Sequence, residues 1–129
     1  MFASGSWRNL RRCDSVSLSD PIVYLLHIRD CCEELALCRS LRDEGTIPDS
    51  ILFNAVCRNL EIVGEATRKV SPDFRAAHPE IPWREMNDLR NVLIHNYEGA
   101  DKDLVWAIVE RDIPPLLSAV RSALETQGS

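Results

Sequence analysis

Apolar residues recur at helical spacing along most of the chain from residue 20 onward. The first series steps by three, four and three residues and consists of Leu25, Ile28, Cys32 and Leu35. Asp20 before Pro21 is typical of a helix start, and the stretch 43–48, which holds a Gly and a Pro, is typical of a turn. The pattern predicts a first helix from about Pro21 to about Arg42.

The second predicted helix runs from about Asp49 to about Val70 and is apolar on two neighbouring faces. One face carries Leu52, Val56, Leu60, Val63, Thr67 and Val70, and the other carries Ile51, Ala55, Ile62 and Ala66. Together they are wider than the ~100° stripe that one core contact needs. We therefore expect the second face to be buried against a partner, and Gly64 between the two faces suggests close helix packing.

The remainder of the chain continues the helical pattern. Residues 71–82 hold three prolines and predict an irregular connection, after which a third helix runs from near Pro82 until Gly99 ends it. A fourth helix starts near Asp101, and the pair Pro114-Pro115 should kink or restart it. The pattern predicts an all-α, up-and-down four-helix bundle with a kinked or broken C-terminal helix.

The chain divides into three segments by composition. Residues 1–19 are rich in Ser and Arg and lack a sustained apolar period, so we expect a flexible N-terminal extension without the apolar centre of a signal peptide. Residues 20–126 form the helical domain, and residues 127–129 form a tail. A length of 129 residues fits one domain.

Charge and cysteine content narrow the class of protein. A net charge of −5 argues against a protein that coats duplex nucleic acid, although it leaves room for a small basic cleft. The five cysteines form no C-x-x-C pair, which favours neither a disulfide framework nor a zinc site. No run reaches the ~18 apolar residues of a membrane-spanning helix. We expect a soluble protein of a reducing cytoplasm.

Candidate chemistry is concentrated in residues 90–97, Arg-Asn-Val-Leu-Ile-His-Asn-Tyr. RNA cleavage by 2′-hydroxyl attack needs proton transfers and a cation that stabilises the phosphorane. His95 titrates near neutrality and suits the proton transfers, whereas Arg90 stays charged. Asn91 can orient the imidazole, and Tyr97 can donate to a phosphate oxygen or stack on a base. This chemistry requires no metal, and the nearby carboxylates have no metal-ligand spacing.

Helix geometry limits how these groups can cooperate. On a regular helix Arg90 and His95 differ by roughly 140° in azimuth, whereas Asn91 and His95 share a face. Two arrangements could bring the pair together. The backbone could leave helical geometry near His95 and Tyr97, or two chains could each supply one group, and we expect both.

Ordinary explanations for the same residues stay open on the residues alone. An Arg-x-x-x-x-His spacing occurs by chance in many helices, and a His near a helix C-terminus often compensates the helix dipole. Tyr97 could be a half-buried phenol. His27 and His78 are more typical of surface or packing residues, and Trp83 and Trp106 of core or interface anchors. A purely structural bundle therefore stays an alternative.

The flanks of the motif carry a resemblance to a known family. Residues 52–116 resemble the HepT-like branch of the HEPN superfamily, the toxin half of a bacterial toxin–antitoxin pair. The marks are Glu61-Ile62-Val63-Gly64-Glu65-Ala66, Ile81-Pro82-Trp83, Arg90-Asn91 followed by His95-x-Tyr97, Val105-Trp106 and Ile113-Pro114. The similarity continues more weakly to about Asp20 and about Leu124.

This resemblance implies a homodimer with a composite cleft, acting as a metal-independent endoribonuclease on tRNA or mRNA without a cofactor. Arg90 and His95 occupy the catalytic positions, and Asn91 the polar position after the Arg. Tyr97 matches the tyrosine that an MntA-type nucleotidyltransferase antitoxin modifies with AMP in related pairs. The implied partners are RNA and this antitoxin, which could join the dimer in a larger hetero-oligomer. The alternative is a non-catalytic helical module that docks a nucleotidyltransferase or a nucleotide.

Overall fold

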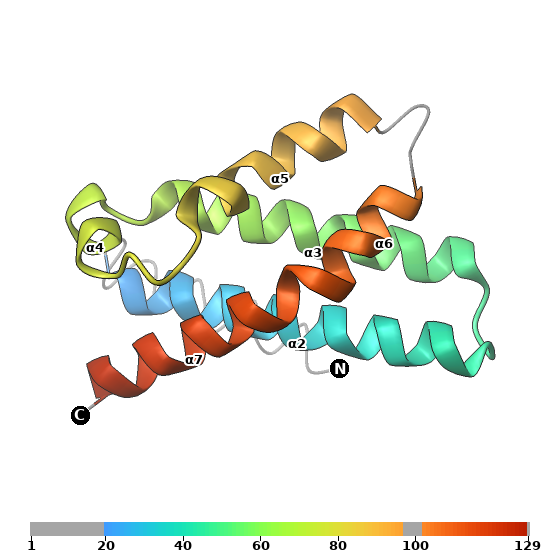
Figure 1. The fold of residues 1–129 in the computed structure, drawn as a ribbon, viewed down its shortest axis with the longest axis horizontal. Helices are drawn as coiled ribbons and strands as arrows, with labels where there is room; N and C mark the ends of the chain where they lie inside the picture. The colour runs from blue at the N-terminus through green and yellow to red at the C-terminus, as the bar shows by residue number, and fades with distance from the viewer. Residues whose placement is uncertain (1–19, 97–101, 129) are drawn as a thin grey trace.

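The regular structure of the described residues is entirely helical. The computed structural model describes residues 20–96 and 102–128, which form six helices. They are α2 (Pro21–Glu44), α3 (Asp49–Lys69), α4 (Pro72–Ala77), α5 (Trp83–Asn96), α6 (Lys102–Arg111) and α7 (Ile113–Gly128). In Figure 1, α2 and α3 form an antiparallel hairpin, with α7 along α2 and α5 along α3. The predicted all-α bundle is confirmed.

Both ends of α2 follow from local chemistry. The side chain of Asp20 accepts a hydrogen bond of 2.9 Å from the amide of Ile22, and Pro21 takes the first helical position. At the other end Gly45 has a φ of 72°, a left-handed conformation that costs glycine little. Its amide donates to the carbonyls of Leu41 and Arg42. This cap places the helix end at Glu44, slightly beyond the predicted Arg42.

Helix α3 is the central helix, because α2 packs against one side of it and α5 against another. The second apolar face therefore contacts helices of the same chain. Ala66 is buried, and Ala55 and Ile62 pack against the core. Ile51, near the start of α3, is the exception and is 58% exposed. Part of this face is therefore covered within the chain, and burial of the remainder against a partner stays a prediction.

Two buried polar side chains of α3 form hydrogen bonds within their own helix. The amide of Asn59 donates to the carbonyl of Ala55 at 2.8 Å, and the hydroxyl of Thr67 donates to the carbonyl of Val63 at 2.8 Å. Burial of such groups without a partner would be costly. The central helix therefore satisfies these two groups without a polar partner on α2 or α5.

The connection between α3 and α5 contains a helix that the sequence pattern did not predict. Residues 71–82 were expected to be irregular, but Pro72–Ala77 forms α4. The hydroxyl of Ser71 accepts from the amide of Phe74 at 3.2 Å and caps its start. Pro72 occupies the first helical position, where its missing N–H costs nothing. The proline-containing connection therefore separates α3 from α5 and also contains the short helix α4.

The predicted break in the last helix is confirmed between α6 and α7. Asp112 alone separates the two helices. Pro114 and Pro115 cannot donate to the carbonyls four residues earlier, on Glu110 and Arg111, so α6 cannot continue regularly. The same prolines are tolerated in the first turn of α7.

Some expectations concern residues at the ends of the chain. Residues 1–19, the predicted flexible extension, lie outside the described residues. Helix α7 continues to Gly128, within the segment predicted as a tail. No helix in the described ranges has both the length and the apolar character needed to cross a membrane.

Two leucines on α2 test the location of the core. Leu35 is fully buried, whereas Leu37 is 55% exposed. We expect Leu35→Ala to lower the free energy of unfolding by about 2–5 kcal/mol through lost burial and a cavity. Leu37→Ala, the matched control, should change it by less than about 0.5 kcal/mol. Urea denaturation followed by circular dichroism measures both, and equal losses would contradict this placement of the core.

Candidate functional site

Helix α5 carries three of the four predicted site residues. Arg90, Asn91 and His95 all lie between Trp83 and Asn96, whereas Tyr97 lies outside the described residues. The inward face of α5 is formed by Met86, Leu89 and Leu93, which are buried. This apolar face packs α5 on α3. The predicted motif is therefore displayed on a helix whose position is set by the central helix.

The backbone of α5 is helical through Asn96, so the expected loss of helical geometry at His95 is not observed. The helix extends this far because Leu93 still packs in the core one turn before the end. On a regular helix the positions of Arg90 and His95 differ by roughly 140°. The structure describes the exposed side chain of Asn91, while the side chains of Arg90 and His95 lie outside its description.

Three polar residues of α5 share a helical register with position 95. Positions 84, 88, 91 and 95 follow at steps of four, three and four, which share one helix face. Arg84, Asp88 and Asn91 on this face are all exposed. Sequence reasoning paired Asn91 with His95 but did not include Arg84, although the same spacing rule reaches it. The described side chains that share this face with position 95 are thus the amide of Asn91, the carboxylate of Asp88 and the guanidinium of Arg84.

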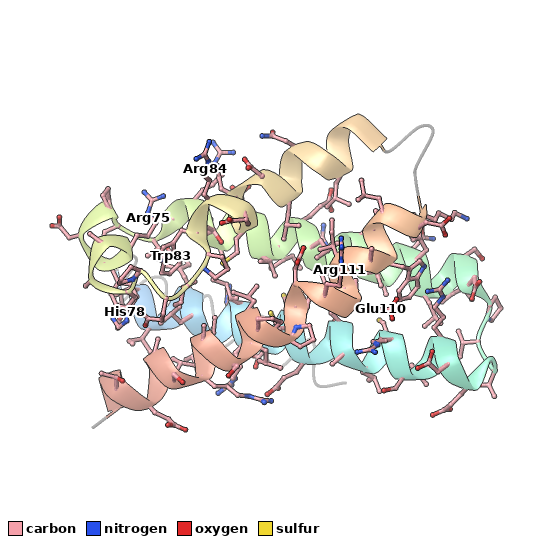
Figure 2. All side chains as sticks on the ribbon, viewed as in Figure 1. Arg75, His78, Trp83, Arg84, Glu110 and Arg111 are labelled. Atoms are coloured by element: carbon pink, nitrogen blue, oxygen red, sulfur yellow. The ribbon has the colours of Figure 1, made fainter. Side chains whose placement is uncertain are left out.

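A tryptophan fixes the start of α5 to the end of α4. The indole Nε1 of Trp83 donates to the carbonyl of His78 at 2.9 Å and to the carbonyl of Arg75 at 3.1 Å. The same two carbonyls also accept backbone amides, from Ile81 and His78 respectively, so the indole is a second donor to each. Figure 2 shows Trp83 lying inward between α4 and the body of the bundle. The predicted role of Trp83 as an anchor is confirmed.

The sequence matches a known family along most of its length. The model described as "Ribonuclease HepT-like" matches residues 28–123, which include α5 and the whole motif. The chain belongs to the HepT-like family. The resemblance found in the motif and its flanks is thereby confirmed, and ribonuclease is the activity by which this family is named.

Curated relatives of this HepT-like chain carry related names. It is 33% identical over 111 residues to "Putative RNase TTE0752" of Caldanaerobacter subterraneus subsp. tengcongensis, covering 85% of this chain and 99% of the relative. It is 47% identical over 74 residues to "Putative RNase MJ1380" of Methanocaldococcus jannaschii, covering 57% and 68%. It is 53% identical over 62 residues to "Probable ribonuclease HepT" of Thermococcus cleftensis, covering 48% and 56%. No solved structure matches the chain significantly.

The histidine next to the anchor of this HepT-like chain is a packing residue. The ring of His78 lies 4.4 Å from that of Phe74, centroid to centroid, and its Nδ1 lies 3.1 Å from a carboxylate oxygen of Glu80. A backbone hydrogen bond and the bond to His78 hold the pKa of Glu80 below its usual range. His78 is only 9% exposed, so the expectation that it packs is confirmed.

The buried cysteines of the described core are poor candidates for a catalytic or metal-binding site. Burial is the main cause that raises the pKa of Cys31 and of Cys32 to about 12. A thiol with such a pKa is protonated near neutrality and is a poor nucleophile or metal ligand. Within residues 20–96 and 102–128, no three His, Cys, Asp or Glu side chains gather as metal ligands would. The motif on α5 is thus the best-supported candidate site.

The anchor makes a stability prediction for the HepT-like fold. Trp83→Phe keeps most of the apolar contact with Phe74 but removes the indole donor to two carbonyls. Each carbonyl keeps a backbone donor, the amide of His78 or of Ile81. We therefore expect the free energy of unfolding to fall by about 0.5–1.5 kcal/mol, the usual net contribution of a hydrogen bond. Urea denaturation measures the loss, and hydrogen exchange should show faster exchange in the first turn of α5. Unchanged stability and exchange would contradict the anchoring role.

Proposed function

We propose that this protein is a metal-independent endoribonuclease and the toxin of a toxin–antitoxin pair. The observation that carries the proposal is the match of residues 28–123 to the ribonuclease HepT-like family, with Arg90, Asn91 and His95 on one helix inside that match. The exposed side chain of Asn91 supports access of a large substrate to this helix. Cellular RNA, either tRNA or mRNA, is the proposed substrate.

Each group of the motif has a chemical task in this reaction. The 2′-hydroxyl oxygen of a ribose attacks the adjacent phosphorus, and the bond from phosphorus to the 5′ oxygen breaks. His95 transfers protons between these oxygens, a contribution typically worth ~10²- to 10⁴-fold in rate. The guanidinium of Arg90 stabilises the extra negative charge of the phosphorane. Asn91, one turn before His95, orients the imidazole.

The active site is completed by a second copy of the chain. The azimuths of Arg90 and His95 differ by roughly 140° on a regular helix, and α5 is helical at both positions. A homodimer in which two α5 helices approach each other resolves this separation, because the Arg of one copy then faces the His of the other. Two-fold symmetry makes this contact reciprocal. The dimer is therefore a requirement of the proposed chemistry.

Tyr97 is the site at which the enzyme is switched off. It directly follows α5, close in sequence to Arg90 and His95. Transfer of AMP from ATP to its hydroxyl by a cognate nucleotidyltransferase antitoxin releases pyrophosphate and leaves a phosphodiester and an adenine on the ring. The added negative charge competes with RNA phosphate for the Arg90 guanidinium, and the nucleotide blocks the cleft.

Substitution of the proposed catalytic pair tests the enzyme. We expect His95→Ala and Arg90→Ala each to reduce RNA cleavage by at least ~10²-fold, because each removes a group that acts in the transition state. Asn87→Ala, at an exposed position of the same helix, is the control and should leave cleavage unchanged. Labelled tRNA and mRNA are incubated with the protein, with and without a chelator, and the ends are sequenced.

Two outcomes would contradict the catalytic assignment. Cleavage that persists in either variant would remove that residue from the mechanism. Stable RNA or nucleotidyltransferase binding without cleavage by the unmodified protein would favour the non-catalytic binding module. Circular dichroism and sedimentation of each variant verify that the fold and the oligomeric state are retained.

The proposed off-switch has its own test in co-expression with a cognate nucleotidyltransferase. We expect the intact mass to rise by one adenylate, with peptide mapping locating it on Tyr97 and with loss of RNA cleavage. Tyr97→Phe should abolish the mass gain and leave the toxin active. Tyr24→Phe is the matched control, because Tyr24 is the other tyrosine of the sequence and is buried. An adenylate on another residue would refute the role of Tyr97.

A further inference from the structure

We infer that Arg75 and Arg84 form a phosphate-binding subsite that holds RNA away from the cleavage motif. The inference rests on the proposed ribonuclease function and adds a surface that contacts the substrate. Arg75 comes from α4 and Arg84 from the first turn of α5. Neither residue belongs to the proposed catalytic group, so the two roles can be separated experimentally.

The Trp83 anchor brings the two arginines to one place. Its indole Nε1 lies 3.1 Å from the carbonyl oxygen of Arg75, and Arg84 is the next residue along α5. The two guanidinium groups therefore extend from backbone positions joined across the α4–α5 junction. Figure 2 shows both side chains projecting from the same edge of the molecule. Their backbone positions are fixed before any ligand binds, which reduces the entropy cost of bringing the two residues together.

Both arginines are available to an anionic ligand. Within the described part of the chain, no ion pair involves Arg75 or Arg84. Arg39 pairs with Glu110 and Arg121 with Glu33, whereas the exposed Arg58, Arg68 and Arg111 also have no ion pair among the described residues. The feature of this edge is therefore that two arginines without ion pairs meet at one helix junction. Planar guanidinium groups bind phosphate oxygens through paired N–H donors. Two such groups at one edge give a locally positive surface on a chain whose net charge is negative.

The buried part of Arg75 is a second, independent observation. Its Nε atom is buried and has no hydrogen-bond partner in the described structure. Such groups are rare in native proteins and indicate that a partner is missing from the structure. A phosphate bound at the terminal nitrogens of Arg75 would supply compensating negative charge next to this donor. The Arg75 guanidinium therefore has hydrogen-bonding capacity that the described structure does not use.

The carboxylates near the two arginines do not neutralise them. Asp73, Glu85 and Asp88 are exposed and form no ion pair with either arginine. The carboxylate of Glu80 instead lies beside Nδ1 of His78. The subsite therefore suits a polymer whose phosphates contact the guanidinium groups specifically, and it is less suited to diffuse attraction of any anion.

The subsite lies in line with the cleavage motif. Position 84 shares a helical register on α5 with positions 91 and 95, and the rise of a helix separates Arg84 from His95 by ~16 Å along the axis. A single RNA strand that reaches His95 can therefore follow α5 to Arg84 and Arg75. This arrangement requires an RNA several nucleotides longer than the bond that is cleaved.

The experiment measures the salt dependence of RNA binding by the full chain. A His95→Ala background keeps the RNA intact, and fluorescence anisotropy reports binding of a labelled single-stranded RNA over a series of salt concentrations. Each phosphate contact to a single strand contributes ~0.7 to the slope of log K against log salt. We expect Arg75→Gln combined with Arg84→Gln to reduce the magnitude of this slope by ~1.4, for two lost contacts.

A matched double variant separates a specific subsite from a change in net charge. Arg39→Gln combined with Arg121→Gln removes the same charge at positions on α2 and α7, and should leave the slope unchanged. In the catalytically intact chain, the Arg75/Arg84 double variant should raise KM for a long RNA and leave kcat unchanged. Circular dichroism verifies that each double variant is folded.

The outcomes distinguish failure of the subsite from failure of the proposed function. If the unsubstituted chain neither cleaves nor binds RNA, the proposed function is wrong and the subsite falls with it. If it cleaves RNA but the Arg75/Arg84 variant keeps the full slope, the subsite alone is wrong. Equal slope changes in the two double variants would overturn it as well. Loss of nucleotidyltransferase binding with an unchanged RNA slope would assign the surface to a protein partner.

Discussion

The burial of α3 on two sides is the constraint on which the rest of the structure depends. Its two neighbouring apolar faces need more contact area than one helix provides, and α2 and α5 supply it. Helix α2 is in turn covered by α7. Because α5 is placed by its contact with α3, the location of the proposed catalytic residues is a consequence of core packing.

Two further features determine how α5 presents its exposed polar face. Trp83 joins the start of α5 to the end of α4 through two carbonyls, so the helix is held at its beginning by hydrogen bonds as well as by apolar contact. Met86, Leu89 and Leu93 then fix its rotation, because turning the helix would expose them. The proposed phosphate subsite lies at the anchored end and the proposed catalytic residues near the opposite end. Helix α5 thus sets the distance between the proposed phosphate subsite and the proposed catalytic residues.

Much of the fold could be predicted from the sequence, because helical periodicity and the capping residues are local. The ends near Asp20 and Gly45 and the break at Pro114-Pro115 follow from single residues. Helix α4 was missed because a proline is compatible with both a loop and the first turn of a helix. The hydrophobic pattern of α3 shows that its second face is apolar. It cannot show which other helix packs against that face.

The candidate site was predictable in its composition but less so in its geometry. The motif on α5 and the family could be identified from consecutive residues, whereas helical backbone at His95 contradicted the expected irregularity. The proximity of Arg75 and Arg84 depends on an indole that spans the α4–α5 junction, and no spacing rule for one helix contains that information.

The self-contained hydrogen bonds of Asn59 and Thr67 have a consequence for how this fold can diverge. Both polar groups are satisfied by the backbone of α3, so the contacts of α3 with α2 and α5 do not depend on matched polar pairs at these two positions. Loss of either polar group therefore requires no coordinated polar change on the facing helix. The interior of α3 can therefore change in sequence while the position of α5 is retained.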